Sequence, residues 1–271
     1  MPVSVASLVV ITDVDGTLID HNTHEWDAAR AWLTRLEAHQ VPVVLCSSKT
    51  AAELTGLQKV LGLDGQPFIA ENGAVISLDA SWSDHPDYPR LLTGARHEEI
   101  RTLLEQLRDA HGYKFTTVSD VDEQTLSEWS GLTPKMAALA KLQEASETLI
   151  WRDSDPQLAA FTAALSENGL MLIEGGRFWH VLDQQGGKDQ AIAWLMKQYR
   201  QRRGNDLVTL GLGDAPGDAP LLDATDYAVV VKGYSRNAVT LKQDTPERVY
   251  RTAEYGPAGW SEGLTHFLGE Q

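Results

Sequence analysis

Two kinds of apolar pattern alternate along the first 78 residues. The uninterrupted aliphatic run at residues 8–11 predicts a strand buried on both faces of a parallel sheet. Apolar side chains then recur at helical spacing over residues 25–40, and a second buried-strand pattern follows at 41–46. This strand–helix–strand order is the repeating unit of an α/β sheet.

A further helix and a hairpin are predicted before the pattern changes. Thr50 and Glu53 have the spacing of a capping box, so a helix should begin there and run to about residue 61, before Gly62. A short strand at residues 67–70 leads into Asn72-Gly73, a pair that favours a hairpin turn. The stretch 79–89 then loses all periodicity and contains two prolines, which indicates a domain junction.

The middle of the chain predicts a different kind of unit. Helical and strand patterns alternate irregularly, and the last two strands form a hairpin around Gly175-Gly176. Helices packed on an antiparallel sheet, an α+β arrangement, explain this order most simply. The expected helices cover residues 100–107, 136–140 and 155–165, and the expected strands cover 113–118, 149–151, 170–174 and 177–182.

After Gly186-Gly187 the first pattern returns, with helices at 188–200 and 260–268 and strands at 207–212 and 227–231. We therefore predict an α/β fold: a doubly wound, Rossmann-like parallel sheet core with an inserted α+β cap domain. The core should comprise residues 1–85 and 185–271, and the cap residues 86–184.

Charge and composition narrow the possible partners. The formal net charge of −15 argues against a nucleic-acid or anionic-membrane surface, since both require excess Lys and Arg. The single cysteine, Cys46, permits no internal disulfide, and the short apolar start lacks the basic residues of a signal peptide. No apolar stretch approaches a membrane span. A cytoplasmic protein with a small-molecule partner is expected, and the oligomeric state stays open.

Acidic residues follow two of the predicted core strands. Asp13 and Asp15 come directly after the first strand, and Asp214 and Asp218 follow the strand at 207–212. Ligands of open α/β sheets bind at the carboxyl ends of the strands. Adjacent strands lie about 4.8 Å apart, so carboxylates from two neighbouring strand ends can share one hard cation. Two unrelated acidic turns are the alternative.

A hydroxyl group and a lysine occupy matching places between these acids. Ser47 ends the strand at 43–46, although Ser48 and Thr50 are equally eligible there. Lys188 opens a helix after two glycines, where backbone N–H groups favour an anion. Taken singly, each is more often an ordinary cap or a solvated loop charge.

In this order, the motifs Asp13-Val-Asp-Gly-Thr-Leu18, Ser47, Lys188 and Gly213-Asp-Ala-Pro-Gly-Asp218 resemble those of the haloacid dehalogenase superfamily. The resemblance implies a phosphatase in which Asp13 is the nucleophile and Asp15 the general acid and base. It implies Mg²⁺ bound by the Asp13 carboxylate, the Asp15 backbone carbonyl and Asp214, with support from Asp218. Ser47 and Lys188 would hold the phosphoryl oxygens.

Glu71-Asn-Gly-Ala74 and the position of the cap resemble the branch of sugar-phosphate phosphatases with an α/β cap, above all the mannosyl-3-phosphoglycerate phosphatases. Further matches are Cys46-Ser-Ser-Lys-Thr50, Leu132-Thr-Pro134, Glu174-Gly-Gly-Arg-Phe-Trp-His-Val181 and Gly186-Gly-Lys-Asp189. The resemblance therefore implies a phosphorylated sugar as substrate, and in particular the dephosphorylation of mannosyl-3-phosphoglycerate to mannosylglycerate. Asn72, Gly73, Arg177 and His180 are the candidate substrate-binding residues, the last two expected on one face of one strand.

Two positions depart from the family pattern, and rival functions stay open. Gly217 stands where asparagine is common, and Gln143 where a basic cap residue is expected. A broad-specificity sugar phosphatase or a phosphosugar mutase shares the same chemistry. A phosphate-accepting receiver module is a rival of another class, but it lacks an acid at the position of Asp15 and a cap of this size.

Overall fold

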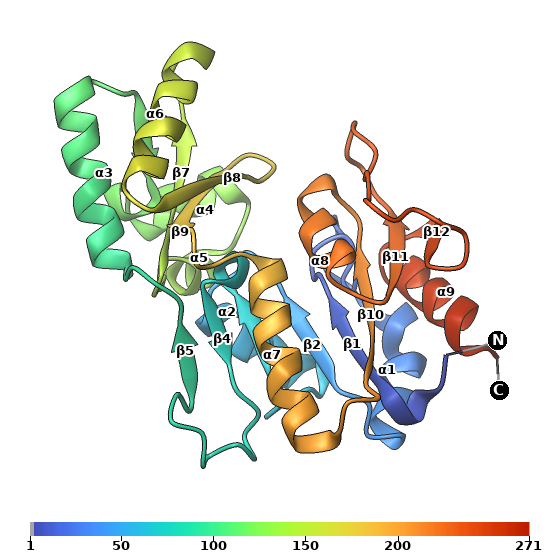
Figure 1. Ribbon diagram of the computed structural model, residues 1–271. Coiled ribbons are helices and arrows are strands. Elements are labelled where there is room, and N and C mark those ends of the chain that lie inside the picture. Colours follow the sequence, from blue (N-terminus) through green and yellow to red (C-terminus); the bar gives the residue numbers. More distant parts are fainter. Residues whose placement is uncertain (1–2, 271) are drawn as a thin grey trace.

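The computed structural model describes residues 3–270, which form a large core and a smaller cap (Figure 1). The core is built on an eight-stranded sheet and the cap on a separate four-stranded sheet. This arrangement confirms the predicted α/β core with an inserted α+β cap. Among the described residues, no helix combines the length and the apolar character that a bilayer span requires.

The core sheet is doubly wound. Its strand order is β12-β11-β10-β1-β2-β3-β4-β5; the pairs from β12 to β3 are parallel, and the last two pairs are antiparallel. The chain reaches β1 first and then builds outward in both directions, so the ends of β1 and β10 lie at a switch point. The strands are β1 (Leu8–Thr12), β2 (Val43–Cys46), β3 (Phe68–Ala70), β4 (Val75–Ser77), β5 (Arg90–Leu92), β10 (Val208–Gly213), β11 (Tyr227–Lys232) and β12 (Val249–Tyr255).

Helices cover both faces of this sheet, which explains why its central strands contain continuous apolar runs. Val10 packs with α1 (Arg30–Ala38), α2 (Ala51–Leu61) and α9 (Gly256–Leu268), whereas Val9 packs with α7 (Lys188–Arg203) and α8 (Ala219–Asp223). Successive side chains of a strand point to opposite faces, so a strand between two helical layers needs apolar residues at every position.

The cap is an antiparallel sheet of order β6-β7-β9-β8 with helices packed against it. Leu149 and Val181 from its central strands are buried with Phe161 and the apolar side of α3. The cap elements are α3 (His97–His111), β6 (Phe115–Thr117), α4 (Glu123–Ser130), α5 (Pro134–Ala140), β7 (Ser146–Trp151), α6 (Asp155–Glu167), β8 (Leu170–Glu174) and β9 (Trp179–Asp183).

The sheet pairing moves one expected boundary. β5 pairs with β4 in the core sheet, so residues 90–92 belong to the core and not to a cap that begins at residue 86. The proline-containing stretch 79–89 is the loop between these two strands. A three-residue strand is too short to show alternation, which is why the loss of periodicity was misread as the domain junction.

Two connections join the core and the cap, and they lie side by side. Ala95 N–H donates to the Asp183 carboxylate at 2.9 Å, and a β-carbon on Gly94 would lie 2.1 Å from the same side chain. Gly94 has a φ of +74°, a conformation that favours glycine. The cap therefore leaves and re-enters the core at one place.

Candidate active site

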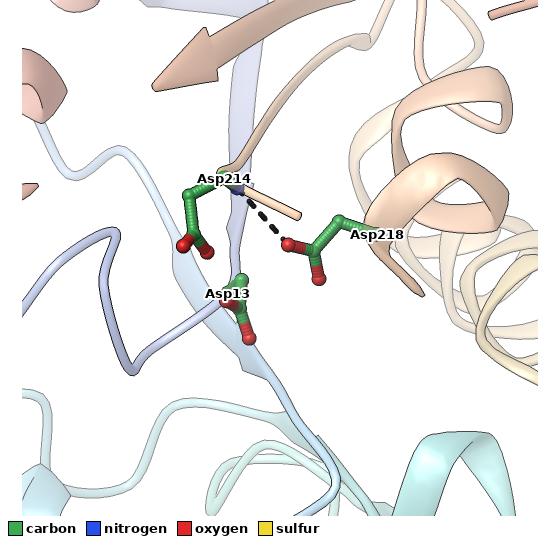
Figure 2. Close-up of side chains that lie close together, drawn as sticks. All are labelled: Asp13, Asp214 and Asp218. Carbon is green, nitrogen blue, oxygen red and sulfur yellow. Dashed lines mark hydrogen bonds between the residues drawn. The ribbon is translucent and has the colours of Figure 1, made fainter. Parts of the chain in front are cut away.

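Three aspartates meet at the carboxyl edge of the core sheet (Figure 2). Asp13 follows β1, and its N–H donates to the Leu212 carbonyl of neighbouring β10 at 2.9 Å. Asp214 follows β10 directly, and Asp218 ends the short 3₁₀ turn Pro216–Asp218. One carboxylate oxygen from each of the three lies within 4.8 Å of the others. The structure thus brings Asp13 together with two acids that lie about two hundred residues further along the sequence.

Asp218 both holds the loop after β10 and neutralises a buried lysine. One carboxylate oxygen accepts hydrogen bonds from Asp214 N–H at 3.0 Å and Ala215 N–H at 3.1 Å. The other lies 3.2 Å from Lys188 Nζ, at the first residue of α7. Both side chains of this ion pair are at least nine-tenths buried. The lysine ammonium is therefore fixed beside the acidic cluster.

The charges of the cluster alter one another's protonation. Burial and then the Asp218 charge raise the pKa of Asp13 well above its usual value, and Lys188 only partly opposes this. Burial and the Asp218 charge also raise the pKa of Asp214, to about 6. Burial disfavours the charged form of Lys188, but Asp218 and Asp13 outweigh it and raise the pKa of that ammonium. The site holds more negative charge than one lysine neutralises.

This donor set fits a hard divalent cation. Carboxylate oxygens are the protein ligands that Mg²⁺ prefers, and a dication would remove the repulsion that raises the pKa of Asp13 and Asp214. The Asp15 carboxylate lies outside the three-acid group. The contribution predicted for Asp15 is that of its backbone carbonyl, and this stays a prediction.

Asp214→Asn should flatten the pH dependence of stability of the metal-free protein. The Asp214 pKa is about 6 when folded and 3.8 when unfolded, so its protonation stabilises the fold fully below about pH 4. That contribution, on the order of 3 kcal/mol, is lost as the pH rises through about 6. Thermal unfolding in EDTA from pH 4 to 7 should show a smaller loss in Asp214→Asn than in the wild type, because Asp13, whose pKa is also raised, remains in both.

The same variant should also lose stabilisation by magnesium at pH 7, since ligand binding to the folded state raises its stability. Asp64→Asn, at an exposed loop position, is the matched control and should behave as the wild type in both measurements. Equal stabilisation by Mg²⁺ in Asp214→Asn and the wild type would contradict a metal site at Asp214.

The turn after Asp13 positions the cluster through two residues to which the sequence analysis gave no role. Thr17 is fully buried, and its hydroxyl lies 2.9 Å from Asp214 and 3.4 Å from Asp13. Gly16 has a φ of +78°, and a β-carbon there would lie 2.5 Å from the Asp214 carboxylate. Both belong to the Asp-x-Asp-Gly-Thr motif, but their purpose becomes visible only when Asp214 is placed beside them.

Ser47 and Asn72 lie in two loops that hydrogen-bond to each other. Ser47 is buried after β2; its hydroxyl oxygen accepts from Lys49 N–H at 3.1 Å, and its carbonyl accepts from Asn72 N–H at 3.0 Å. Asn72 is also buried and has a φ of +58°. The predicted roles of both side chains in substrate binding are not decided by these backbone contacts and stay predictions.

Gly73 allows the loop after β3 to approach the start of α7. A β-carbon at this position would lie 2.1 Å from the Gly187 carbonyl oxygen and 2.8 Å from Lys188 N, and the φ of Gly73 is +96°. The predicted contact of Gly73 with substrate stays a prediction. The close backbone packing at Gly73 sets the position of Lys188.

Gly73→Ala should therefore lower the free energy of unfolding by about 2–4 kcal/mol, because strained φ and steric overlap add. Urea unfolding measures this effect. Gly62→Ala is the matched control: Gly62 has a φ of +73°, but its added β-carbon would meet nothing within 4 Å. It should cost only about 1 kcal/mol. Equal losses in the two variants would show that contact with Gly187 is unimportant.

Asp15 is not part of the three-acid group and pairs with Lys49. Lys49 Nζ lies 3.2 Å from the Asp15 carboxylate and 3.6 Å from that of Glu53. Glu53 completes the predicted capping box, since its carboxylate accepts from Thr50 N–H at 3.0 Å. Lys49 lies two residues after Ser47 and four before Glu53, a spacing that was available in the sequence but was given no function.

A pocket of about 230 Å³ lies between Asp15 and the cap. The core contributes Asp15, Lys49 and Glu53, and the cap contributes polar and aromatic side chains that face them. The cap residues that bear on its chemistry are Ser130, Gln143, Thr148, Phe178 and His180. A larger open hollow of about 870 Å³ lies beside the start of β10, but no acid of the Asp13–Asp15 motif or of the three-acid cluster lines it. The smaller pocket is lined by Asp15, two residues after Asp13, so we place the active site there.

The structure separates the two cap residues that were predicted to share a face. His180 lies in β9 and lines the pocket, whereas Arg177 precedes β9, is exposed and donates a hydrogen bond to the Trp129 carbonyl. That prediction was wrong because side chains three positions apart in an extended chain point to opposite faces. Phe178, two positions before His180, shares the pocket instead.

Clustered acids at the switch point of a doubly wound sheet, a buried lysine beside them and a cap above them define a hydrolase of the capped α/β class. The chain belongs to the haloacid dehalogenase-like hydrolases, since the model of that family matches residues 10–241. The match spans both core segments and the cap.

Solved structures with the same fold include sugar phosphatases. A protein from Thermoplasma acidophilum aligns with a TM-score of 0.68 at 16% identity, covering 97% of this chain and 98% of the other. The sucrose-phosphatase from Synechocystis, in complex with sucrose and phosphate, gives 0.62 at 18% identity over 96% and 98%. A subclass IIB sugar phosphatase gives 0.63 at 14% identity over 96% and 98%. At these identities the likeness concerns the fold.

Proposed function

We propose that this protein is a Mg²⁺-dependent phosphomonoester hydrolase that acts on a phosphorylated sugar through an aspartyl-phosphate at Asp13. The observation that carries the proposal is the placement of Asp13 among two further acids and near Lys188, with Asp15 lining a pocket between the core and the cap. The acids would hold the metal, Lys188 and Ser47 the phosphoryl group, and the pocket the leaving group.

In the first step, an Asp13 carboxylate oxygen attacks phosphorus and the bond from phosphorus to the ester oxygen breaks. Asp15 gives its proton to that ester oxygen as the alcohol leaves. Asp15 is suited to this task because it lines the leaving-group pocket and lies outside the metal cluster. Lys188 offsets part of the negative charge that gathers on the phosphoryl oxygens.

In the second step, Asp15 takes a proton from water, and the resulting hydroxide oxygen attacks the phosphorus of the aspartyl-phosphate. The bond between phosphorus and the Asp13 oxygen breaks, which releases inorganic phosphate and restores the carboxylate. When bound, Mg²⁺ supplies positive charge that reduces the repulsion between the clustered carboxylates and the anionic phosphoryl group.

For the leaving group we propose a glycosylated glycerate, so that mannosyl-3-phosphoglycerate is the substrate. Lys49 is the one lysine or arginine among the residues that line the pocket, and when Asp15 carries the proton that it gives to the leaving group, Glu53 is the one ionised carboxylate still paired with it. A glycerate carboxylate next to the phosphate ester would find its countercharge there. Hydroxyl and amide groups elsewhere in the pocket suit a sugar ring.

Phosphate release from a panel of esters tests the proposal. The purified protein with Mg²⁺ is assayed with mannosyl-3-phosphoglycerate, sucrose 6-phosphate and several hexose phosphates. A clear preference in kcat/KM for mannosyl-3-phosphoglycerate supports both the phosphatase activity and the proposed substrate. Equal rates on all esters would indicate a broad-specificity phosphatase. Transfer of the phosphate to a second hydroxyl of the sugar would indicate a mutase. Stoichiometric labelling of the protein without turnover would indicate a receiver module.

A further inference from the structure

The pocket-facing side of the cap sheet carries two polar side chains in direct register. Thr148 on β7 pairs with His180 on β9, and Thr148 Oγ1 lies 3.1 Å from His180 Nδ1. Their neighbours Leu149 and Val181 point the other way, into the apolar interior of the cap. Thr148 and His180 are therefore held by a rigid sheet and not by a loop.

Gln143 connects this pair to a buried carboxylate. The surrounding hydrogen bonds assign its amide orientation: Nε2 donates to Glu147 Oε1 at 2.8 Å, and Oε1 accepts from Thr148 Oγ1 at 2.7 Å. The reverse orientation would turn the amide oxygen towards a carboxylate oxygen, where neither atom has a proton to give. Gln143 thus links Glu147 and Thr148 in one direction only.

Glu147 fixes that direction because all of its contacts are donors. It is fully buried; Oε1 also accepts from Thr148 N–H at 2.9 Å, and Oε2 accepts from the Ser119 hydroxyl at 2.5 Å and lies 3.0 Å from His97 Nε2. A carboxylate supplied with this many donors acts as an acceptor. The amide N–H of Gln143 must therefore point at Glu147.

The direction of each hydrogen bond between these side chains then follows from the one before it. Gln143 gives its N–H to Glu147, so its oxygen takes the hydroxyl proton of Thr148. Thr148 Oγ1 has only lone pairs left for His180 Nδ1, and Nδ1 must carry the ring proton. Burial and the nearby charge of Lys188 lower the pKa of His180 to about 4, so the ring is neutral and Nε2 is unprotonated.

The Nε2 atom of His180 remains available to a ligand. No residue among 3–270 makes a hydrogen bond to it, and the ring lines the leaving-group pocket together with Asp15. Gly175 lies next to it: a β-carbon there would come within 3.0 Å of Nε2. The missing side chain at Gly175 keeps this lone pair uncovered.

We propose that the relay Glu147–Gln143–Thr148 fixes His180 as its Nδ1–H tautomer, so that His180 Nε2 accepts a hydrogen bond from a hydroxyl group of the leaving group. His180 is then a specificity residue for polyol leaving groups, and the three relay residues position it. This inference rests on the proposed phosphatase function for its ligand, but not for the tautomer itself.

The relay also explains why position 143 carries glutamine and not a basic residue. A lysine or arginine side chain has donors only, so it could not accept the Thr148 proton. Thr148 would then direct its proton to His180 Nδ1, and the ring would present an N–H to the pocket. Gln143 is the neutral link that keeps an acceptor there.

The tautomer can be read without turnover from the ¹⁵N NMR signals of the two ring nitrogens of His180, identified by their loss in His180→Asn. The expected result is a proton on Nδ1 in the wild type and a mixture of tautomers in Thr148→Val. A proton on Nε2 in the wild type would overturn the inference while the proposed function stood. Conversely, absence of phosphatase activity would leave the tautomer result valid.

Kinetics then test the ligand. Glycerol 1-phosphate and propyl phosphate differ only in hydroxyl groups, so the ratio of their kcat/KM values isolates recognition of these groups. Thr148→Val should lower that ratio roughly two- to fivefold, mainly through KM of the glycerol ester, because only the Nδ1–H fraction of the tautomer mixture accepts the hydrogen bond. Thr116→Val on the neighbouring strand β6 is the matched control and should leave it unchanged. An unchanged ratio in Thr148→Val, or equal loss in both variants, would overturn the inference.

Discussion

Asp13→Asn should abolish phosphate release, with kcat reduced by about four to six orders of magnitude. The amide is not a nucleophile, and no other carboxylate of the cluster takes its place: Asp214 and Asp218 are held by Thr17 and by backbone N–H groups. The loss should appear in kcat and not in KM, because the phosphoryl-binding groups remain. Release of phosphate under single-turnover conditions is the measurement.

The same substitution should stabilise the metal-free protein. The pKa of Asp13 is raised in the folded state, chiefly by burial and the Asp218 charge, so the ionised carboxylate costs folding free energy at pH 7. A neutral amide removes that cost, and the melting temperature in EDTA should rise. Asp109→Asn, on the exposed side of α3, is the control and should change neither property. An inactive but destabilised Asp13→Asn protein would indicate a structural role for Asp13.

Lys188→Met should lower both stability and activity. The methionine approximates the length of the lysine, but it leaves Asp218 and Asp13 buried without a cation, and breaking a buried pair in this way costs about 3–5 kcal/mol. Loss of a charge that stabilises the phosphoryl oxygens should reduce kcat by about a hundredfold to a thousandfold. Urea unfolding and phosphate release measure the two effects.

Magnesium distinguishes the two consequences of Lys188→Met. A bound dication should restore much of the stability, because it supplies countercharge to the same carboxylates, but it should not restore kcat. Lys197→Met is the matched control, since Lys197 is exposed on the same helix α7 and should tolerate the change within about 0.5 kcal/mol. A metal-free Lys188→Met protein as stable as the Lys197 variant would mean that the cluster is not ionised.

The sequence was sufficient to predict the fold class but not the two strands at the edges of the core sheet. Buried strands such as β1 and β2 carry continuous apolar runs, and these runs predicted the doubly wound core. β12 was missed because Arg251 and Glu254 interrupt its pattern, as is possible in a strand with a neighbour on one side only. β5 was missed because three residues carry no usable period.

For the site, local motifs predicted the chemistry but not the cap contacts. The structure brings together Asp13, Asp214, Asp218 and Lys188, although their roles in turnover stay predictions. The pocket depends on which face of β7 and β9 turns towards Asp15, and tertiary packing alone decides that. For this reason Arg177 was misplaced and the partnership of Gln143 with Glu147 was out of reach.

The pairing of β1 with β10 has a consequence for biosynthesis. Leu8 on β1 is the partner of Val208 on β10, so the centre of the sheet joins residues 200 positions apart. At a translation rate of about 5–20 residues per second, β1 emerges from the ribosome roughly 10–40 s before its partner. Throughout that interval one edge of an aliphatic strand stays unpaired, the kind of surface that chaperones bind and that aggregates recruit. The cap sheet is complete by residue 183, so the cap can fold on the ribosome before β10, β11 and β12 of the core sheet have been synthesised.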